Sequence, residues 1–360
     1  MTFFTGRVST LQISRFGQGA VQRTSTRLER AGVEVSTGRR ADIFRDLGPR
    51  AASDLALRAR ENLVQTHITS NKVLENKLQA MLDAVEVVRE SASSVLGGAL
   101  ANLKQPMTSV EALRMEARSA IEAVTAALNT TFGGESLFSG TASGVTALTA
   151  WSEVNPSTGV SPEMVVQSIV STPPASVAEA QSMIADLDAV FDSSYSADPA
   201  KNFEATFFNG TPQFDSLGNP MPRVLAQIEP GRTLGYGVQA NDTAFREILK
   251  GLAMLASVDV SQITDPEAYA TWMDAAASAI SEGSDLALSI SAEIGFNQQT
   301  VSDALDRLEA ISMVQKDQIA AYENVDPYEA ATRLNSLKTQ LEASYSVSAQ
   351  LARLTILNYL

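Results

Sequence analysis

The sequence predicts a mainly α-helical protein, an elongated antiparallel coiled-coil bundle built from both termini with a smaller α/β (β-rich) domain inserted between them. Two observations favour this class. Helical periodicity dominates both ends of the chain, whereas the middle holds most of the prolines. Aromatic residues make up only 6% of the 360 residues, and alanine and serine are frequent. This composition suits long packed helices better than a β-sandwich.

The first helix is expected over residues 8–36, where apolar residues recur on one face. It ends at the sequence Ser-Thr-Gly, and Gly38 is well placed as a helix C-cap. The Gly48-Pro49 pair then predicts a turn.

The second helical segment, about 51–105, carries the clearest pattern in the chain. Apolar residues alternate at spacings of four and three, the 3.5-residue repeat of a coiled-coil seam. Extended backwards, the seam meets Leu57, Val64 and His67, and Pro106 is expected to end the helix. Residues 109–129 predict an antiparallel partner helix. The seam residues are Leu74, Leu78, Met81, Val85, Val88, Ala92, Val95 and Ala99.

The helical pattern gives way to proline, glycine and turn signals between about 130 and 240. Turn signals separate short strand-like runs at Phe203–Phe208 and Arg223–Ile228, and one helix is expected at Ser176–Phe191. A helical pattern resumes near residue 242 and continues towards Tyr322. Asp326 is a good N-cap for the last helix, because proline follows it at the first helical position.

Composition and charge exclude several classes of function. The chain has no cysteine, which removes disulfides, thiolate metal sites and cysteine nucleophiles. No stretch approaches the roughly 20 apolar residues of a membrane-spanning helix. The net charge is −14, yet residues 1–60 contain eleven arginines, no lysine and five acids. An acidic remainder disfavours nucleic acid as a partner, since phosphate binding needs clustered cations.

The N-terminus lacks the basic and apolar regions of a secretory signal peptide, so export would need another route. Its arginine-rich start, with no acid before Glu29, also fits an organelle transit peptide. That alternative is disfavoured, because the pattern continues unbroken into a longer helical region.

Residues that could indicate an enzyme have simpler structural interpretations. His67 is the only histidine and falls on the coiled-coil seam, so it has no cysteine or second histidine with which to bind a transition metal. Asp186 and Asp188 are more typical of a solvated helix face than of a cation site. The glycines from Gly133 to Gly140 lack the Lys-Ser/Thr that follows in a phosphate loop. We therefore predict no catalytic, cofactor or metal site.

Both chain ends are apolar helical stripes, whereas terminal residues are normally polar and frayed. We predict that the two stripes lie side by side and are completed by neighbouring subunits, because lone helices are marginal in water. The predicted protein-interaction residues are Val8, Leu11, Phe16, Val21, Leu28, Leu334, Leu337, Leu341, Tyr345, Leu354, Ile356, Leu357, Tyr359 and Leu360.

Short motifs at both ends resemble the bacterial flagellin family. The segment Glu34–Arg40 (EVSTGRR) resembles the family's N-terminal helix end, and Glu323–Asp326, Gln340–Tyr345 and Leu354–Leu360 resemble its C-terminal region. Asn129–Gly140 (NTTFGGESLFSG) and the Asn-Tyr-Leu ending are more like hook–filament junction members than filament flagellin. The resemblance covers roughly 1–140 and 240–360. One departure is the segment Asp42–Arg50, where the family commonly has a serine- and aspartate-rich stretch.

The resemblance implies a non-enzymatic, secreted component of the bacterial flagellum, exported by the flagellar type III apparatus and acting in motility. It implies a ring of copies, with the first hook-associated protein, flagellin and an export chaperone as partners. Terminal segments of such proteins become helical on assembly. The expected domains are an export and polymerisation helix at 1–50, a helical rod at 51–130 and 241–325, an insert at 131–240 and a polymerisation helix at 326–360.

Two alternatives to the junction adaptor stay open. Filament flagellin shares the terminal helices and is separated only by the short motifs above. An exported adhesive or carbohydrate-active surface domain would be displayed by the insert, and it would need a pair of carboxylates converging in a cleft. No membrane and no nucleic acid are expected as partners.

Overall fold

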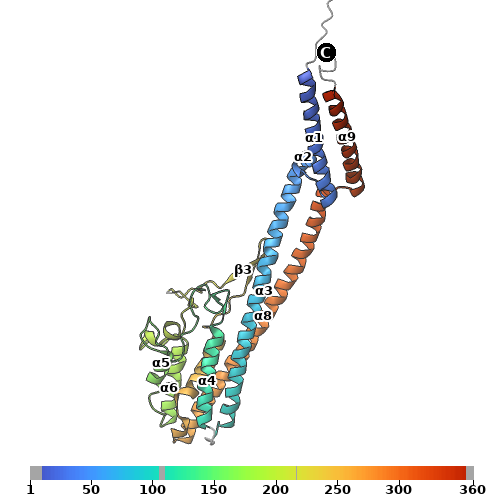
Figure 1. Cartoon of the computed structure of the whole chain (residues 1–360). Coiled ribbons are helices and arrows are strands. Elements are labelled where there is room, and N and C mark those ends of the chain that lie inside the picture. The colour runs from blue at the N-terminus through green and yellow to red at the C-terminus, as the bar shows by residue number, and fades with distance from the viewer. Residues whose placement is uncertain (1–9, 105–109, 216, 354–360) are drawn as a thin grey trace, which may run out of the picture. The chain divides into compact units, whose positions relative to one another are not determined.

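A computed structural model describes residues 10–104, 110–215 and 217–353 (Figure 1). The chain divides into two units, which we describe separately. The terminal unit contains the residues up to 66 and those from 309 onward, and the central unit contains residues 67–308. Among the described residues, no helix has the length and apolar character needed to cross a membrane.

The described part of the terminal unit consists of helices and short turns. The long helices α3 and α8 contribute one end each, and the others lie wholly inside the unit. The elements are α1 (Thr10–Thr37), α2 (Ile43–Leu47), η1 (Gly48–Arg50), the start of α3 (Ala51–Ala101), the end of α8 (Pro266–Glu323) and α9 (Pro327–Arg353).

The predicted end of the first helix and the predicted start of the last helix are confirmed. The amide of Gly38 donates to the carbonyl oxygen of Glu34 at 2.9 Å. The φ angle of Gly38 is +70°, the left-handed conformation that glycine adopts easily at a C-cap. At the start of α9, the Asp326 carboxylate accepts the amide of Tyr328 at 2.8 Å. Helix α1 therefore ends, and helix α9 begins, for the reasons that the sequence indicates.

Helices α1 and α9 lie side by side in antiparallel directions (Figure 1). Glu34, near the end of α1, pairs with Arg333, near the start of α9. At the other end of the pair, Gly17 lies close to Ser348. The sequence prediction that the two chain ends pair is thus confirmed for the described residues.

The core of the central unit is helical. Helix α4 (Val110–Leu128) packs on α7 (Thr243–Ser257), and Tyr269 of α8 donates its hydroxyl to the carbonyl oxygen of Asn102 at 2.7 Å. The eight seam residues of α3 between Leu74 and Ala99 are at most 5% exposed, which confirms the seam. Pro106 lies outside the described residues.

The backward extension of the seam is confirmed at Val64, which is buried, but not at His67. Ile68 is buried, whereas His67 is only half-buried. The next buried position is Asn71, whose side-chain amide donates to the carbonyl oxygen of Ile228 at 2.9 Å. The seam therefore accommodates a buried polar residue, because its side-chain amide has a specific backbone partner.

The insert of the central unit has short elements between α4 and α7, including two two-stranded antiparallel sheets, β1–β2 and β3–β4. The helix expected at Ser176–Phe191 is confirmed as α6, with Ser176 as its N-cap. The elements are β1 (Thr131–Phe132), β2 (Glu135–Ser136), α5 (Pro162–Ile169), α6 (Val177–Phe191), η2 (Pro199–Lys201), η3 (Phe203–Phe207), β3 (Leu225–Glu229), β4 (Arg232–Gly235) and, after α7, η4 (Val260–Gln262).

The strand expected at Phe203–Phe208 is wrong, because these residues form the π-helical turn η3. The rings of Phe203 and Phe207 stack with centroids 5.2 Å apart, and both lie against Phe191. In a strand, two residues four positions apart would be separated by about 13 Å. The helical turn buries both rings in one cluster, and this tertiary contact overrides the strand propensity of phenylalanine.

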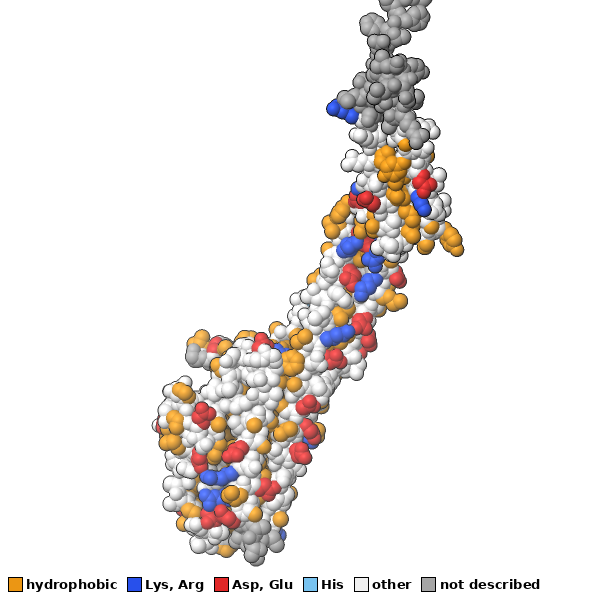
Figure 2. Space-filling model, in the orientation of Figure 1, with side chains coloured by type: hydrophobic (Ala, Val, Ile, Leu, Met, Phe, Trp, Pro, Cys, Tyr) orange, Lys and Arg blue, Asp and Glu red, His pale blue; other side chains and the backbone are white. Residues whose placement is uncertain are grey.

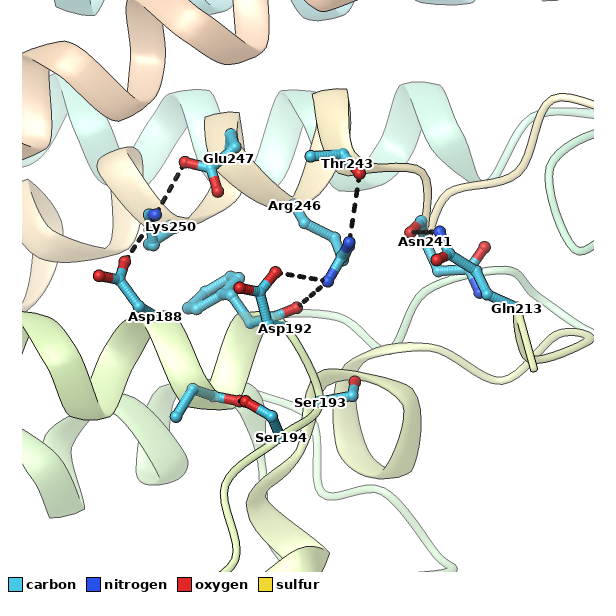
Figure 3. Close-up of polar contacts among 12 residues, drawn as sticks. Asp188, Asp192, Ser193, Ser194, Gln213, Asn241, Thr243, Arg246, Glu247 and Lys250 are labelled. Carbon is cyan, nitrogen blue, oxygen red and sulfur yellow. Dashed lines mark hydrogen bonds and ion pairs between the residues drawn. The ribbon is translucent and has the colours of Figure 1, made fainter. Parts of the chain in front are cut away.

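Charged side chains join the insert to α7 (Figure 3). Arg246 donates to the carbonyl oxygen of Phe191 at 2.7 Å and to the carboxylate of Asp192 at 2.9 Å. Lys250 lies between Asp188 and Glu247, at 2.7 and 2.8 Å. Burial acts to lower the pKa of Lys250, but hydrogen bonds to these two carboxylates outweigh it and raise the pKa. These contacts fix the orientation of α6 on α7.

Candidate assembly surface

The apolar seam between α1 and α9 is only partly covered. Val21 and Leu28 of α1 are half-buried, and so are Leu334, Leu337 and Leu341 of α9. The seam of α3 in the central unit, by comparison, is almost fully buried. Two helices alone cannot enclose their own apolar faces, which is why stable bundles use three or more. The α1·α9 pair therefore leaves apolar area available to other chains.

Large apolar side chains lie on the outside of the same pair. Phe16 is 66% exposed and Tyr345 is 55% exposed. Figure 2 shows hydrophobic side chains on the visible surface of these helices. Among the predicted interaction residues, Leu11 lies in α1. Those outside the described residues are Val8, Leu354, Ile356, Leu357, Tyr359 and Leu360.

The turns at the bases of α1 and α9 are joined through their backbones. Arg39 and Asn324 form an isolated antiparallel bridge. The amide of Arg40 donates to the carbonyl oxygen of Glu323 at 2.8 Å, and the amide of Val325 donates to that of Gly38 at 3.0 Å. These bonds connect residues almost 300 positions apart in the chain. They hold the two turns together, so the helices that follow from them start from a common base.

Buried carboxylates reinforce this base. Glu323 is buried and pairs with Arg58 of α3 and, at 3.6 Å, with Arg39. Arg58 also binds the buried Asp54 at 3.1 Å. Because an unpaired buried carboxylate is costly, these acids require their arginines to be in place. The network therefore ties α3, the end of α8 and the turn after α1 into one cluster.

Two further buried acids lie in the terminal unit. Glu34 of α1 pairs with Arg333 of α9 at 3.2 Å. Glu61 of α3 accepts a hydrogen bond from Ser312 of α8 at 3.0 Å and pairs with Lys316 at 3.5 Å. The sequence pattern does not predict these contacts. The burial of Glu61 has one indication in the sequence, because Glu61 lies three residues before Val64 on the backward continuation of an apolar seam.

The residues considered for enzymatic roles have structural contacts. Asp188 binds Lys250, and Leu187 beside it is fully buried, so this segment is a packed helix face. Gly133 and Gly134 have positive φ angles and form the β1–β2 turn. Within the described part of the chain, no group of three or more histidine, aspartate or glutamate side chains is arranged to hold a metal ion.

Comparison with known proteins is consistent with this geometry. Residues 8–143 match the family described as the bacterial flagellin N-terminal helical region, and residues 274–360 match the bacterial flagellin C-terminal helical region. No curated protein sequence matches the chain.

Solved structures similar in fold include that of the "putative flagellar hook-associated protein from Vibrio parahaemolyticus". The identity is 14% and the TM-score is 0.52, and the alignment covers 77% of this chain and 99% of the other.

The two flagellin regions together cover more than half of the 360 residues, and they include both helices of the α1·α9 pair. Flagellin-family proteins are structural parts of the flagellum and serve in motility, so this chain is a structural component rather than an enzyme. The chain belongs to the bacterial flagellin family.

Proposed function

We propose that the chain is the hook–filament junction adaptor, flagellar hook-associated protein 3. Two segments favour this member over filament flagellin: Asn129–Gly140, which includes the Leu-Phe-Ser-Gly sequence, and the ending Asn358-Tyr359-Leu360. In this role the chain is exported through the type III apparatus with the help of a chaperone. It then assembles as a ring between the first hook-associated protein and flagellin.

The half-buried seam of the α1·α9 pair carries this proposal. Neighbouring copies would cover the exposed sides of α1 and α9 and complete a helical layer around the axis of the flagellum. Residues 1–50 and 326–360 would then act as the polymerisation segments, while the rod and the insert at 131–240 extend outward. Assembly buries apolar area that a single copy leaves in water, and this burial is the driving force.

Deletion of residues 331–360, which removes nearly all of α9, tests the assembly role. We expect cells that secrete the shortened chain and build hooks, but carry no attached filaments, because α1 loses its partner. A matched control deletes the same number of residues from the insert, for example 141–170. Electron microscopy of the cells reads the result. Normal filaments with the C-terminal deletion would reject the assembly role.

Copy number separates the junction adaptor from filament flagellin. An adaptor is present in about one ring's worth of copies per flagellum, whereas a filament contains thousands. Quantitative mass spectrometry of purified hook–filament structures measures this ratio. A ratio close to that of flagellin itself would favour the filament interpretation.

A further inference from the structure

A row of arginines lies along one face of α1. Arg23, Arg27 and Arg30 are spaced by four and three residues, and Arg15 lies about two turns earlier. At about 100° of rotation per residue, the four fall within an arc of roughly 120°. The side chains of Arg15, Arg23 and Arg27 are exposed, and that of Arg30 is half-buried. We call these four residues the arginine stripe.

The arginine stripe has no acidic partner among the residues that the structure describes. No ion pair within the described ranges includes any of the four arginines. Three of the described residues of α1 are buried. Thr24 and Ala31 lie roughly 110° around the helix from the centre of the stripe. Glu34, four residues after Arg30, is already paired with Arg333. Like charges three and four residues apart destabilise a helix. The stripe is therefore unfavourable in a single copy, and an acidic surface on another molecule would offset its self-repulsion.

A row of carboxylates on α8 has the opposite charge. Between Pro266 and Asp306 this helix contains seven acidic residues and no lysine or arginine. All seven acids are exposed, and the five from Asp274 to Asp303 fall within an arc of roughly 100°. We call these five residues the acidic stripe. They are Asp274, Glu282, Asp285, Glu293 and Asp303.

The acidic stripe is longer than the arginine stripe, and both reflect the charge of the units that carry them. The arginine stripe extends for about 22 Å and the acidic stripe for about 44 Å, so the acidic stripe is long enough to face the whole arginine stripe. The chain segments assigned to the terminal unit contain 15 basic and 12 acidic residues, whereas those of the central unit contain 12 basic and 29 acidic residues. One copy thus offers a basic surface and a separate acidic surface.

We propose that the arginine stripe of one copy docks on the acidic stripe of a second copy. The proposal rests on the proposed function, since it names the surfaces through which neighbouring copies of the assembly recognise each other. A contact between two different patches is heterologous, so each copy can bind one neighbour through α1 and another through α8. Contacts of this kind repeat into rings or helical arrays. Opposite charges also select orientation and register.

A charge-swap experiment tests the pairing. Variant one carries Arg23→Glu, Arg27→Glu and Arg30→Glu, and variant two carries Glu282→Arg, Asp285→Arg and Glu293→Arg. Each variant alone presents two stripes of the same sign, whereas a mixture restores opposite charges at both contacts. A matched control, Arg45→Glu with Arg50→Glu and Arg60→Glu, makes the same charge change at exposed arginines outside the stripe.

The readout is swimming of cells that lack their own copy of the chain, with secreted protein measured in the medium and helicity measured on the purified variants. We expect at least a tenfold loss of swimming cells for each variant alone, near-native swimming for the two together, and little loss for the control. Native swimming by either variant alone overturns the stripe pairing but leaves the assembly role intact. Failure of the native chain to restore swimming would reject the assembly role itself.

Cross-linking gives a second measurement that does not depend on swimming or on a charge change. Because the chain has no cysteine, a pair of introduced cysteines reports on one contact. Thr26 lies within the arginine stripe and Ser289 within the acidic stripe, and both are exposed. Copies with Thr26→Cys and copies with Ser289→Cys should form a disulfide dimer under mild oxidation of intact cells. The pair Thr26→Cys and Ser93→Cys, on α3, serves as the control. Equal dimer in both pairs, or none in the first, contradicts the docking.

The charge-swap experiment also shows whether the arginine stripe binds a second copy of the chain or a different anionic molecule. If the arginine stripe bound a different acidic molecule, variant one would fail alone and also when mixed with variant two. Variant two alone would then behave like the native chain. That pattern would overturn the proposal.

Discussion

Glu34 of α1 and Arg333 of α9 form an ion pair of 3.2 Å, although 298 positions of the chain lie between them. The Glu34 carboxylate is buried, whereas about half of the Arg333 side chain is exposed. Arg333 also binds the exposed Glu329 at 2.6 Å. The ion pair therefore fixes the point at which the two terminal helices begin to run side by side, close to the joined turns at Gly38 and Asn324.

Replacing Arg333 by alanine should loosen the α1·α9 pair, because it leaves the Glu34 carboxylate buried without its cation. An unsatisfied buried polar group costs about 1–3 kcal/mol. Since about 1.4 kcal/mol corresponds to a tenfold change in an equilibrium, amide hydrogen exchange in α1 should become roughly ten times faster. The control Glu329→Ala removes only an exposed pair and should change exchange by less than about threefold. Equal effects of both variants would contradict the role assigned to Glu34.

The sequence pattern predicted the helices and the pairing of the two chain ends, but not the ion pair between Glu34 and Arg333. The seam from Leu74 to Ala99 is readable because each residue is apolar and the spacing is regular. The caps at Gly38 and Asp326 are readable because they depend on local backbone chemistry.

Glu34, Asp54 and Glu323 could not be recognised as buried, because their burial depends on arginines brought from distant segments. In the same way, the stacking of Phe203 on Phe207 could not be inferred from a run that also fits a strand. Local sequence patterns therefore predict the helices and their ends, whereas the contacts between distant segments arise only from the tertiary structure.

Exposed apolar residues of the pair should matter for assembly and not for the stability of a single copy. Phe16→Ser and Tyr345→Ser together should change the free energy of unfolding by less than about 0.5 kcal/mol, since both side chains lie mostly in water. The same double variant should reduce incorporation into flagella severalfold, as measured by immunoblotting of sheared filaments and hooks. Leu225→Ser, at an equally exposed site of the central unit, is the control. Unchanged incorporation would remove these residues from the proposed contact.

The hairpin β3–β4 should detach from α8 at low pH. Arg307 of α8 donates to both carboxylate oxygens of Glu229, at 2.9 and 3.1 Å. The hydrogen bonds from Arg307, with a smaller contribution from Arg232, lower the pKa of Glu229 below its ordinary value. Because the pKa of Glu229 is lower in the folded protein than in the unfolded chain, the ionised carboxylate stabilises the folded state at pH values above the unfolded pKa of about 4.3. This stabilisation is lost as the pH falls through the folded-state pKa of Glu229.

Hydrogen exchange in β3 and β4 should therefore increase as the pH is lowered below about 4, after correction for the intrinsic exchange rate. In a Glu229→Gln variant the hairpin should be looser near neutral pH and should lose this pH dependence. The pair is partly open to solvent, so high salt should weaken it as well. If Glu229→Gln keeps the native pH dependence, another group controls the hairpin.

Two glycines of α8 should respond to alanine in opposite directions. A Cβ atom at Gly283 would lie 2.7 Å from the carbonyl oxygen of Ala244 and from the amide nitrogen of Ile248, both on the backbone of α7. The backbone cannot move aside as a flexible side chain can, so α7 and α8 approach closely only because Gly283 has no side chain. Gly283→Ala should therefore lower the free energy of unfolding by about 1–3 kcal/mol.

At Gly295 an added Cβ would meet nothing within 4 Å. Gly295→Ala should raise the free energy of unfolding by about 0.5–1 kcal/mol, because alanine favours the helix. Urea denaturation followed by circular dichroism measures both variants, and the same sign of change in the two would show that α7 and α8 are not packed as closely as their glycines allow.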